Sequence, residues 1–166
     1  MISFKTVSMV LVLTALGACT SADRFGSGSG VRADGGLAGS VSDPTSPAYF
    51  SQAIGDRVLF EVDQSVLTPA AMVVLDGQAT WLTQNPEYTA LVEGHADEQG
   101  TRQYNIALGE RRATAVQTYL VSRGVAPGRL RTISYGKERP IEVCSDEACY
   151  SQNRRAVTVL AVGAGV

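Results

Sequence analysis

Cysteine, histidine, tryptophan and net charge are all scarce in this chain. Its 166 residues include three cysteines, one histidine and one tryptophan, and aromatic residues make up 7%. A single histidine and so few cysteines argue against a metal centre built from these ligands. The formal charge is −2, or −3 without residues 1–18 and their one lysine, which argues against a nucleic-acid partner. We therefore expect no metal, no cofactor and no nucleic acid.

The chain also lacks an apolar segment long enough to span a bilayer. Its N-terminal apolar run, residues 7–18, has the length of a signal-peptide core. The run ends in Leu16-Gly17-Ala18-Cys19, which resembles the processing site of bacterial lipoproteins. We expect residues 1–18 to be removed and Cys19 to be lipidated, and by the same resemblance Thr20 favours the outer membrane. The alternative is ordinary secretory cleavage, which would leave Cys19 as a free thiol.

Large apolar side chains are sparse between the expected lipid and the folded part. Residues 19–54 contain a Gly-Ser repeat and two prolines, so we expect a flexible tether. Residues 55–166 are long enough for one domain with a single core. Its two cysteines, Cys144 and Cys149, are expected to pair with each other in an exported protein. Their spacing is not C-x-x-C, which argues against a redox role.

Apolar periodicity predicts the order β-α-β-α-β-β for this domain. Thr68-Pro69 opens the first helix and Asn85-Pro86 ends it, while Gly124 ends the second. The expected elements are strand 57–62, helix 68–84, strand 88–95, helix 104–123, strand 130–135 and strand 156–162, with a further helical turn left open at 150–154. Two helices between strands most simply lie together on one face of the sheet. The prediction is a two-layer α/β sandwich with a mixed four-stranded sheet.

Six separated blocks, in the same order, resemble the peptidoglycan-associated lipoproteins of Gram-negative bacteria and, more broadly, OmpA-like domains. The blocks are Phe60-Glu61-Val62-Asp63, Val92-Glu93-Gly94-His95-Ala96-Asp97-Glu98, Tyr104-Asn105, Leu108-Gly109-Glu110-Arg111-Arg112-Ala113, Ser134-Tyr135-Gly136-Lys137-Glu138 and Asn153-Arg154-Arg155. The likeness covers about residues 55–166, and the lipidation site agrees independently. It implies an OmpA-like domain that binds peptidoglycan non-covalently and is not an enzyme.

The resemblance also implies which residues bind. The family's diaminopimelate-binding pair, an aspartate after the second strand and an arginine in the long helix, falls on Asp97 and Arg112. An amino-acid terminus carries an ammonium and a carboxylate, so a carboxylate and a guanidinium can hold both ends. The loop Asp63-Gln64-Ser65-Val66 matches the family segment whose backbone N–H groups cover the ligand carboxylate. Asn105 and Leu108 share a helical stripe with Arg112, so we expect them at the edge of the site.

For the whole protein, the resemblance implies an outer-membrane lipoprotein whose domain faces the periplasm. Its implied partners are the peptidoglycan stem peptide, the propeller protein TolB and other Tol envelope proteins. The implied role is to link the outer membrane to the cell wall within the Tol-Pal system and to help draw the membrane inward at division.

Other interpretations fit the same residues. Asp97 and Arg112 could form a purely structural ion pair. Glu93, His95 and Asp97 alternate along one strand and could serve a metal-dependent wall hydrolase. The groove could instead bind only protein partners, with wall contact incidental. The adjacent arginines at 111–112 and 154–155 invite an anion site, but such neighbours point to different sides, and we expect at least one of each pair in solvent.

Overall fold

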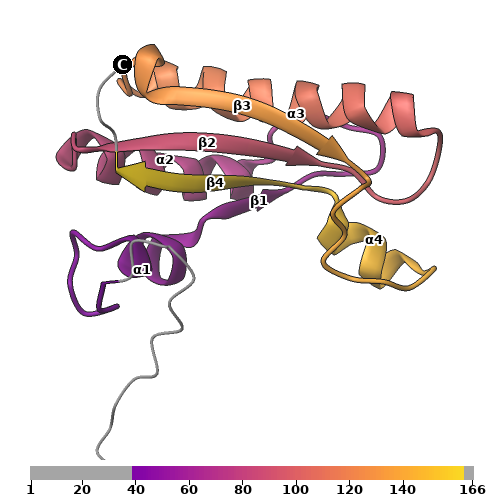
Figure 1. Ribbon diagram of the computed structural model, residues 1–166, viewed down its shortest axis with the longest axis horizontal. Helices are drawn as coiled ribbons and strands as arrows, with labels where there is room; N and C mark the ends of the chain where they lie inside the picture. Colours follow the sequence, from indigo (N-terminus) through magenta and orange to yellow (C-terminus); the bar gives the residue numbers. More distant parts are fainter. Residues whose placement is uncertain (1–38, 163–166) are drawn as a thin grey trace, which may run out of the picture. The chain divides into compact units, whose positions relative to one another are not determined.

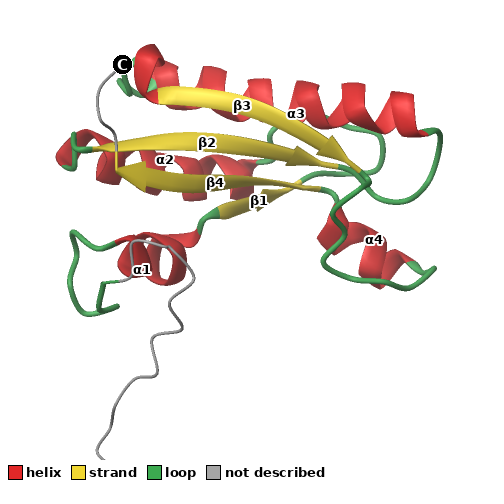
Figure 2. Cartoon of the chain, in the orientation of Figure 1, coloured by secondary structure: helices red, strands yellow, loops and turns green. Residues whose placement is uncertain are grey.

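The computed structural model describes residues 39–162, which form one mixed four-stranded sheet with helices packed against it. The strand order is β1-β4-β2-β3, with β2 and β3 parallel and the other pairs antiparallel (Figures 1 and 2). In chain order the elements are α1 (Pro47–Tyr49), a π-helical turn (Phe50–Gly55), β1 (Arg57–Leu59), α2 (Pro69–Gln84), β2 (Tyr88–His95), α3 (Arg102–Ser122), a 3-10 turn (Pro127–Arg129), β3 (Leu130–Gly136), α4 (Glu147–Asn153) and β4 (Arg155–Val162).

Helices α2 and α3 lie behind the sheet in the view of Figure 1, which confirms the predicted two-layer α/β fold. Strand residues such as Val58 and Val92 are buried in one cluster with Leu75 of α2 and Leu120 of α3. Each such aliphatic side chain contributes about 1.5–3 kcal/mol when it leaves water, so this shared layer holds the sheet and the helices together. Within residues 39–162, no helix combines the length and the apolar character that a membrane crossing requires.

Both long helices begin at a threonine cap. The Thr68 side chain accepts a hydrogen bond from the Ala71 backbone N–H (3.1 Å), and α2 follows with a proline in its first turn. Helix α3 starts two residues earlier than we expected, because Thr101 caps it by accepting from the Tyr104 N–H (3.2 Å). A hydroxyl in this position satisfies one of the free N–H groups of a first turn. The caps therefore fix the residues at which the loops before α2 and α3 end.

The first strand is shorter than predicted. β1 ends at Leu59, whereas the apolar pattern extended it to Val62. The Phe60 N–H still donates to the Arg154 carbonyl (2.9 Å), but the chain then turns away from the sheet, and Asp63 has a φ of +56°. Backbone carbonyls of this loop face an arginine of α3 instead of a neighbouring strand, which is why the ladder stops here.

The packed region begins at Pro44, not at residue 55 as we expected. The Pro44 carbonyl accepts a hydrogen bond from the Trp81 indole N–H (2.7 Å), and the Phe50 ring packs against the Trp81 ring with centroids 5.0 Å apart. Phe50 is 1% exposed. One large aromatic anchors a segment whose composition otherwise indicates a tether. Residues 1–38, with Cys19 and the expected processing site, lie outside the described residues.

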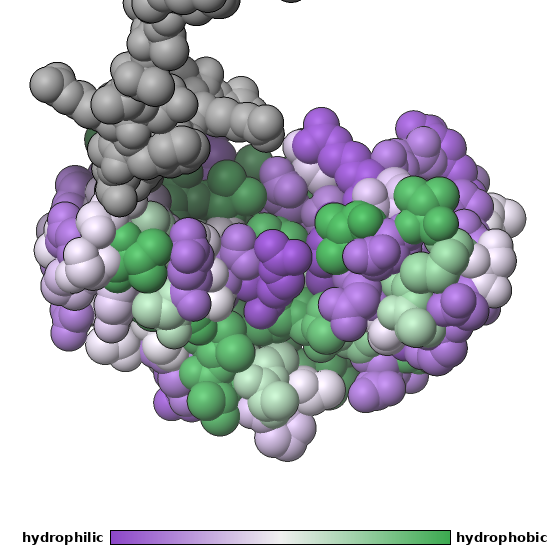
Figure 3. Space-filling model, turned by 90° about the horizontal axis from the view of Figure 1, so that it is seen from below, coloured by the Kyte–Doolittle hydropathy of each residue, from purple (hydrophilic) through white to green (hydrophobic). Residues whose placement is uncertain are grey.

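Some apolar side chains remain exposed. Leu59 and Val159 belong to strands, whereas Val62 and Val66 lie in the loop between β1 and α2, with Val66 69% exposed. Figure 3 shows hydrophobic groups scattered among hydrophilic ones on the side that carries α1 and α4 in Figure 1. The β1–α2 loop thus presents apolar side chains to solvent next to the site described below.

Candidate functional site

The loop after β2, residues 96–100, is fixed by its backbone and is called the Asp97 loop here. The pairing of β2 with β3 shifts register between Gly94 and His95, and the Ala96 N–H donates to the Gly136 carbonyl (2.8 Å). Such irregularities redirect side chains at the end of a strand. Lys137 donates to the carbonyls of Glu98 (3.1 Å) and Gly100 (2.7 Å). The loop that carries Asp97 is thus tied to β3.

Arg112 lies completely buried in the middle of α3. Its Nε donates to the Gln64 carbonyl (2.8 Å), its Nη1 to the His95 carbonyl (2.8 Å) and its Nη2 to the Glu61 carbonyl (3.2 Å). Its guanidinium also lies 5.2 Å from the centroid of the Phe60 ring. One side chain therefore joins the β1–α2 loop to the end of β2.

Burial lowers the pKa of Arg112 from its usual range to about 10, and the nearby Asp97 carboxylate opposes this shift. A pKa of about 10 leaves the group charged at neutral pH. The interior of the site therefore holds a positive charge whose hydrogen bonds go to neutral carbonyls. Such a group can still attract a carboxylate, because charge-assisted hydrogen bonds are stronger than those to neutral oxygens.

Asp97 forms its ion pair with Arg154, not with Arg112. The Arg154 Nη1 lies 3.2 Å from Asp97 Oδ2, and both side chains are largely buried, with 4% and 11% exposed. The Asp97 Oδ1 accepts from the Gln99 N–H (3.2 Å). The direct structural ion pair that we considered for Asp97 and Arg112 is therefore not the observed arrangement. The two residues instead belong to one cluster of alternating charge.

The adjacent arginines turn to different sides, as expected. Arg154 faces Asp97, whereas Arg155 donates to the carbonyls of Asn153 and Arg139. The expectation that one of each pair is solvated holds for the exposed Arg111, but it is wrong for Arg154 and Arg155, which are both buried. Carbonyls and carboxylates around the start of β4 supply most of the partners that make their burial possible, although the Arg155 Nε has none among the described residues.

The predicted ligand loop covers Arg112. Gln64 contributes its carbonyl, and Asp63 accepts a close hydrogen bond from the Tyr104 hydroxyl of α3. Ser65 lines a shallow surface pocket with Arg111 and other residues of α3, and Val66 points into solvent. The loop thus presents carbonyl oxygens to the guanidinium.

Asn105 and Leu108 lie on the buried side of α3, 1% and 4% exposed. The Asn105 side-chain amide donates to the Gln99 carbonyl (2.8 Å), so it supports the Asp97 loop from below. We expected both residues at the edge of the site. Their burial places them beneath it.

His95 is 2% exposed and stacks on Tyr135 with ring centroids 5.6 Å apart. Neither ring nitrogen has a hydrogen-bond partner, although Glu93 Oε2 lies 3.5 Å from Nε2. Burial, reinforced by Arg155 and Arg139, lowers the pKa of His95 to about 4. The lowering indicates that desolvation outweighs the nearby carboxylate. The imidazole is neutral and enclosed.

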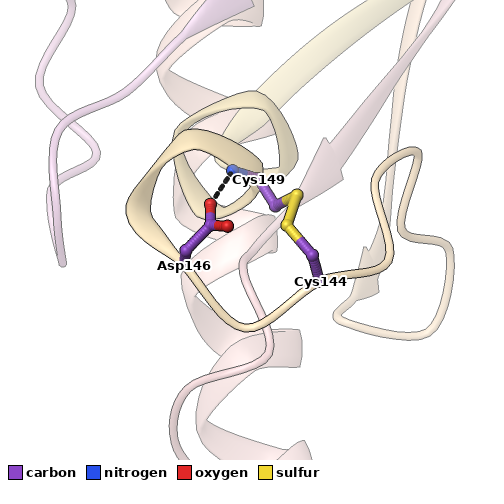
Figure 4. Close-up of side chains that lie close together, drawn as sticks. All are labelled: Cys144, Asp146 and Cys149. Carbon is purple, nitrogen blue, oxygen red and sulfur yellow. Dashed lines mark hydrogen bonds between the residues drawn. A yellow bond between two sulfur atoms is a disulfide. The ribbon is translucent and has the colours of Figure 1, made fainter.

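Cys144 and Cys149 are joined by a disulfide with Cα atoms 5.9 Å apart (Figure 4). Asp146 lies beside them and accepts from the Cys149 N–H (3.2 Å), so the three side chains form a cluster whose ligand atoms lie within 4.8 Å. A metal would need thiolates here, and the disulfide consumes both sulfur atoms. In the oxidised state this cluster is a structural cross-link.

Comparisons with known proteins identify the family of this chain. A model described as the OmpA family matches residues 59–154. The peptidoglycan-associated lipoprotein of Rhizobium meliloti (strain 1021) is 49% identical over 165 residues, covering 99% of this chain and 92% of that protein. That of Mesorhizobium japonicum is 56% identical over 134 residues, covering 80% of this chain and 79% of that protein.

Solved structures give the same assignment. The crystal structure of the peptidoglycan-associated lipoprotein from Burkholderia pseudomallei matches with a TM-score of 0.65 and 36% identity, covering 73% of this chain and 98% of that one. The C-terminal domain of Helicobacter pylori MotB shares the fold, with a TM-score of 0.61, 22% identity, and 66% and 86% of the two chains covered. The chain therefore belongs to the OmpA family and, within it, to the peptidoglycan-associated lipoproteins.

Proposed function

We propose that this protein binds peptidoglycan non-covalently by holding the free amino-acid end of a diaminopimelate residue in the stem peptide. The relatives described above are peptidoglycan-associated by name, which supports the choice of ligand. The observation that carries the proposal is the buried cluster in which Asp97 and Arg112 offer opposite charges beside one loop. A zwitterionic terminus needs both charges.

In the proposed complex, Asp97 receives the ammonium and Arg112 the carboxylate. A guanidinium has five N–H groups, and three of those on Arg112 donate to carbonyls, which leaves two for a ligand. Because Arg112 is fully buried, the loop of Asp63, Gln64, Ser65 and Val66 moves aside and returns over the carboxylate. Opening breaks the hydrogen bonds that Arg112 and Tyr104 make to this loop, whereas the mostly exposed side chains of the loop bury little that must be given up. Asn105 and Leu108 lie on the buried side of α3 and support the site from the interior of the domain.

The proposed anchor is an acylated Cys19 in the outer membrane, with the domain facing the periplasm. In this arrangement the protein links the membrane to the wall and acts within the Tol-Pal system at cell division. The exposed Val62 and Val66 support a protein partner such as TolB at the same loop, because apolar side chains around a polar site favour protein contact. We propose that TolB and the wall compete there.

The geometry does not favour the alternative of a metal-dependent hydrolase. A general base or metal ligand needs access to substrate, but His95 is enclosed and its pKa is lowered to about 4. We therefore treat the protein as a binding protein, not an enzyme.

Sedimentation with purified sacculi tests the proposal. Asp97→Asn and Arg112→Lys should remain in the supernatant, whereas Arg111→Lys, an exposed neighbour on the same helix, should sediment like the wild type. Circular dichroism at the assay temperature establishes that each variant is folded. Normal sedimentation of both site variants would show that the clamp is wrongly placed.

Competition on the wild-type domain gives a second test that needs no variant. A diaminopimelate-containing stem peptide should release the domain from sacculi. A lysine-containing peptide has the ammonium but lacks the carboxylate for Arg112, so it should compete poorly. Equal competition would remove the role given to Arg112.

A further inference from the structure

The segment closed by the disulfide contacts the Asp97 loop directly. We call residues 141–153, which include Cys144–Cys149 and α4, the clasp segment. The Tyr150 hydroxyl donates to Glu98 Oε1 (3.0 Å), and the Ser145 hydroxyl donates to the same oxygen (3.2 Å). Glu98 is the neighbour of Asp97 in sequence. The clasp segment therefore holds one side of the loop that carries the proposed ammonium ligand.

A second contact runs through Glu147 in the first turn of α4. Its carboxylate binds Arg154 with both oxygens: Oε2 lies 3.3 Å from Nη1, and Oε1 is in close contact with Nη2. The same Nη1 reaches Asp97 Oδ2 at 3.2 Å. Glu147 is 65% exposed and Arg154 only 4%. The buried guanidinium of Arg154 is thus shared between the exposed carboxylate of Glu147 and the carboxylate of Asp97.

This sharing sets the charge that a ligand meets. Among these four side chains, Asp97 and Glu147 balance Arg154 and Arg112, so the four are neutral together and suit a zwitterion, which is also neutral. Without Glu147 the cluster carries an excess positive charge. Of the two carboxylates that Arg154 contacts, Asp97 is then the one that remains, so an incoming ammonium meets a carboxylate that is already neutralised.

Glu147 depends on the clasp for its position. Helix α4 has seven residues, too few to be stable alone. Its start is held by the Asp146 cap and by the disulfide (Figure 4). Its end is held by Asn153, whose side chain accepts from the Ile141 N–H (2.9 Å) and donates to the Glu142 carbonyl (2.8 Å). Removing the disulfide would free the first turn, which carries Glu147.

We propose that the clasp segment positions Asp97 for the ligand ammonium, with Glu147 and Tyr150 as positioning residues that act through Arg154 and Glu98. The Cys144–Cys149 disulfide then adjusts selectivity for the ammonium without touching the ligand. This inference rests on the proposed function, because it assigns Asp97 the ammonium.

Three synthetic stem peptides test the inference by titration calorimetry: the diaminopimelate peptide, the same peptide with that amine acetylated, and the lysine peptide. Glu147→Gln should weaken the two amine-bearing peptides alike, by about three- to fivefold, as suits a largely exposed ion pair. Binding of the acetylated peptide should be unchanged or tighter. The preference for the diaminopimelate peptide over the acetylated peptide therefore falls, while the preference for it over the lysine peptide stays the same.

Two further variants separate positioning from general stability. Glu142→Gln removes an exposed carboxylate of the same segment that does not contact Arg154, so all three affinities should equal those of the wild type. Cys144→Ser/Cys149→Ser should reproduce the selectivity change of Glu147→Gln. Adding Glu147→Gln to it should have little further effect, because both act on one contact.

The outcomes distinguish this inference from the function on which it rests. If the wild type does not prefer the diaminopimelate peptide, the proposed function and the inference both fail. If the wild type shows the preference but Glu147→Gln binds like Glu142→Gln, only the inference is overturned. Equal weakening of all three peptides by Glu147→Gln would also overturn it, since loss of structure does not select for the ammonium.

Discussion

His95 makes the stability of the domain depend on pH. Its pKa is lowered from 6.5 to about 4 because the ring is buried near Arg155 and Arg139. Between these two values the unfolded chain takes up a proton that the folded chain does not bind. Lowering the pH from 6.5 to 4 should therefore destabilise the fold, by up to about 3 kcal/mol from this residue.

Urea unfolding at several pH values measures this effect, and His95→Phe is the control because phenylalanine can still stack on Tyr135. The variant should lose the part of the pH dependence between pH 4 and 6.5 and keep the part due to carboxylates. As the chain has one histidine, its ring protons can be followed directly by NMR. A midpoint near 6.5 in the folded protein would contradict the prediction.

Arg112 is also structural, since it serves three backbone carbonyls at once. In Arg112→Lys an ammonium replaces the planar fork and leaves at least one buried carbonyl without a donor. We expect a loss of about 1–3 kcal/mol in the free energy of unfolding, measured by urea titration. Arg111→Lys, on the exposed side, should change stability by less than about 0.5 kcal/mol.

At the scale of elements, β2 and α3 approach each other through a pair of glycines. A Cβ atom on Gly94 would overlap the Gly109 carbonyl, and backbone atoms cannot yield as a flexible side chain can. Gly94→Ala should therefore destabilise the domain by about 1–3 kcal/mol or more, or prevent folding. Gly128→Ala is the matched control, because nothing lies within 4 Å of its Cβ position. Thermal unfolding of the two variants gives the comparison.

The elements that the sequence revealed are those with strong local signals. Capping threonines and apolar periodicity located α2 and α3 to within a few residues. The end of β1 was misplaced because Val62 fits a strand pattern, whereas the chain turns there to meet Arg112, which is distant in sequence. For α4 the apolar pattern leaves a helical turn at 150–154 open, although Asp146 followed by Glu147 is a typical helix start.

The candidate site shows the same difference between local signals, which the sequence reveals, and contacts between distant residues, which it does not. Asp97 and Arg112 were named through resemblance, and the structure brings them into one charged cluster. The contacts that organise this cluster, Arg154 with Asp97 and Glu147, were missed. They join residues up to 57 positions apart, and no spacing rule indicates which carboxylate a buried arginine will meet.

For the molecule as a whole, residues 44–55 belong to the folded unit. A chain that starts at residue 56 lacks Phe50 and the Pro44 carbonyl, so it exposes Trp81, which is 3% exposed in the intact domain. Compared with a chain that starts at residue 39, it should lose about 3–5 kcal/mol of stability, the typical loss for a deleted core aromatic.

Tryptophan fluorescence reports on this contact, since Trp81 is the only tryptophan. Emission should move to longer wavelength in the truncated chain. Phe50→Ala should give a smaller shift, because the Pro44 hydrogen bond remains. Val41→Ala, at a position 44% exposed, should give none. Identical spectra and stabilities for the two chain lengths would show that the folded domain begins near residue 55 after all.

The three carbonyls that accept hydrogen bonds from Arg112 compete with the carboxylate of the proposed ligand for the same guanidinium. In the proposed complex, opening of the loop takes the Gln64 and Glu61 carbonyls away from Arg112, so a ligand carboxylate replaces these two oxygens and also meets the two N–H groups that donate to no carbonyl. Apparent affinity is reduced by the fraction of molecules in which the loop stands open. A carboxylate terminus forms stronger hydrogen bonds with Arg112 than the carbonyls that it replaces. An amidated terminus offers only another neutral oxygen, so the exchange does not strengthen its binding. If the proposed function holds, we therefore expect wall fragments with an amidated terminus to bind more weakly than those with a free carboxylate.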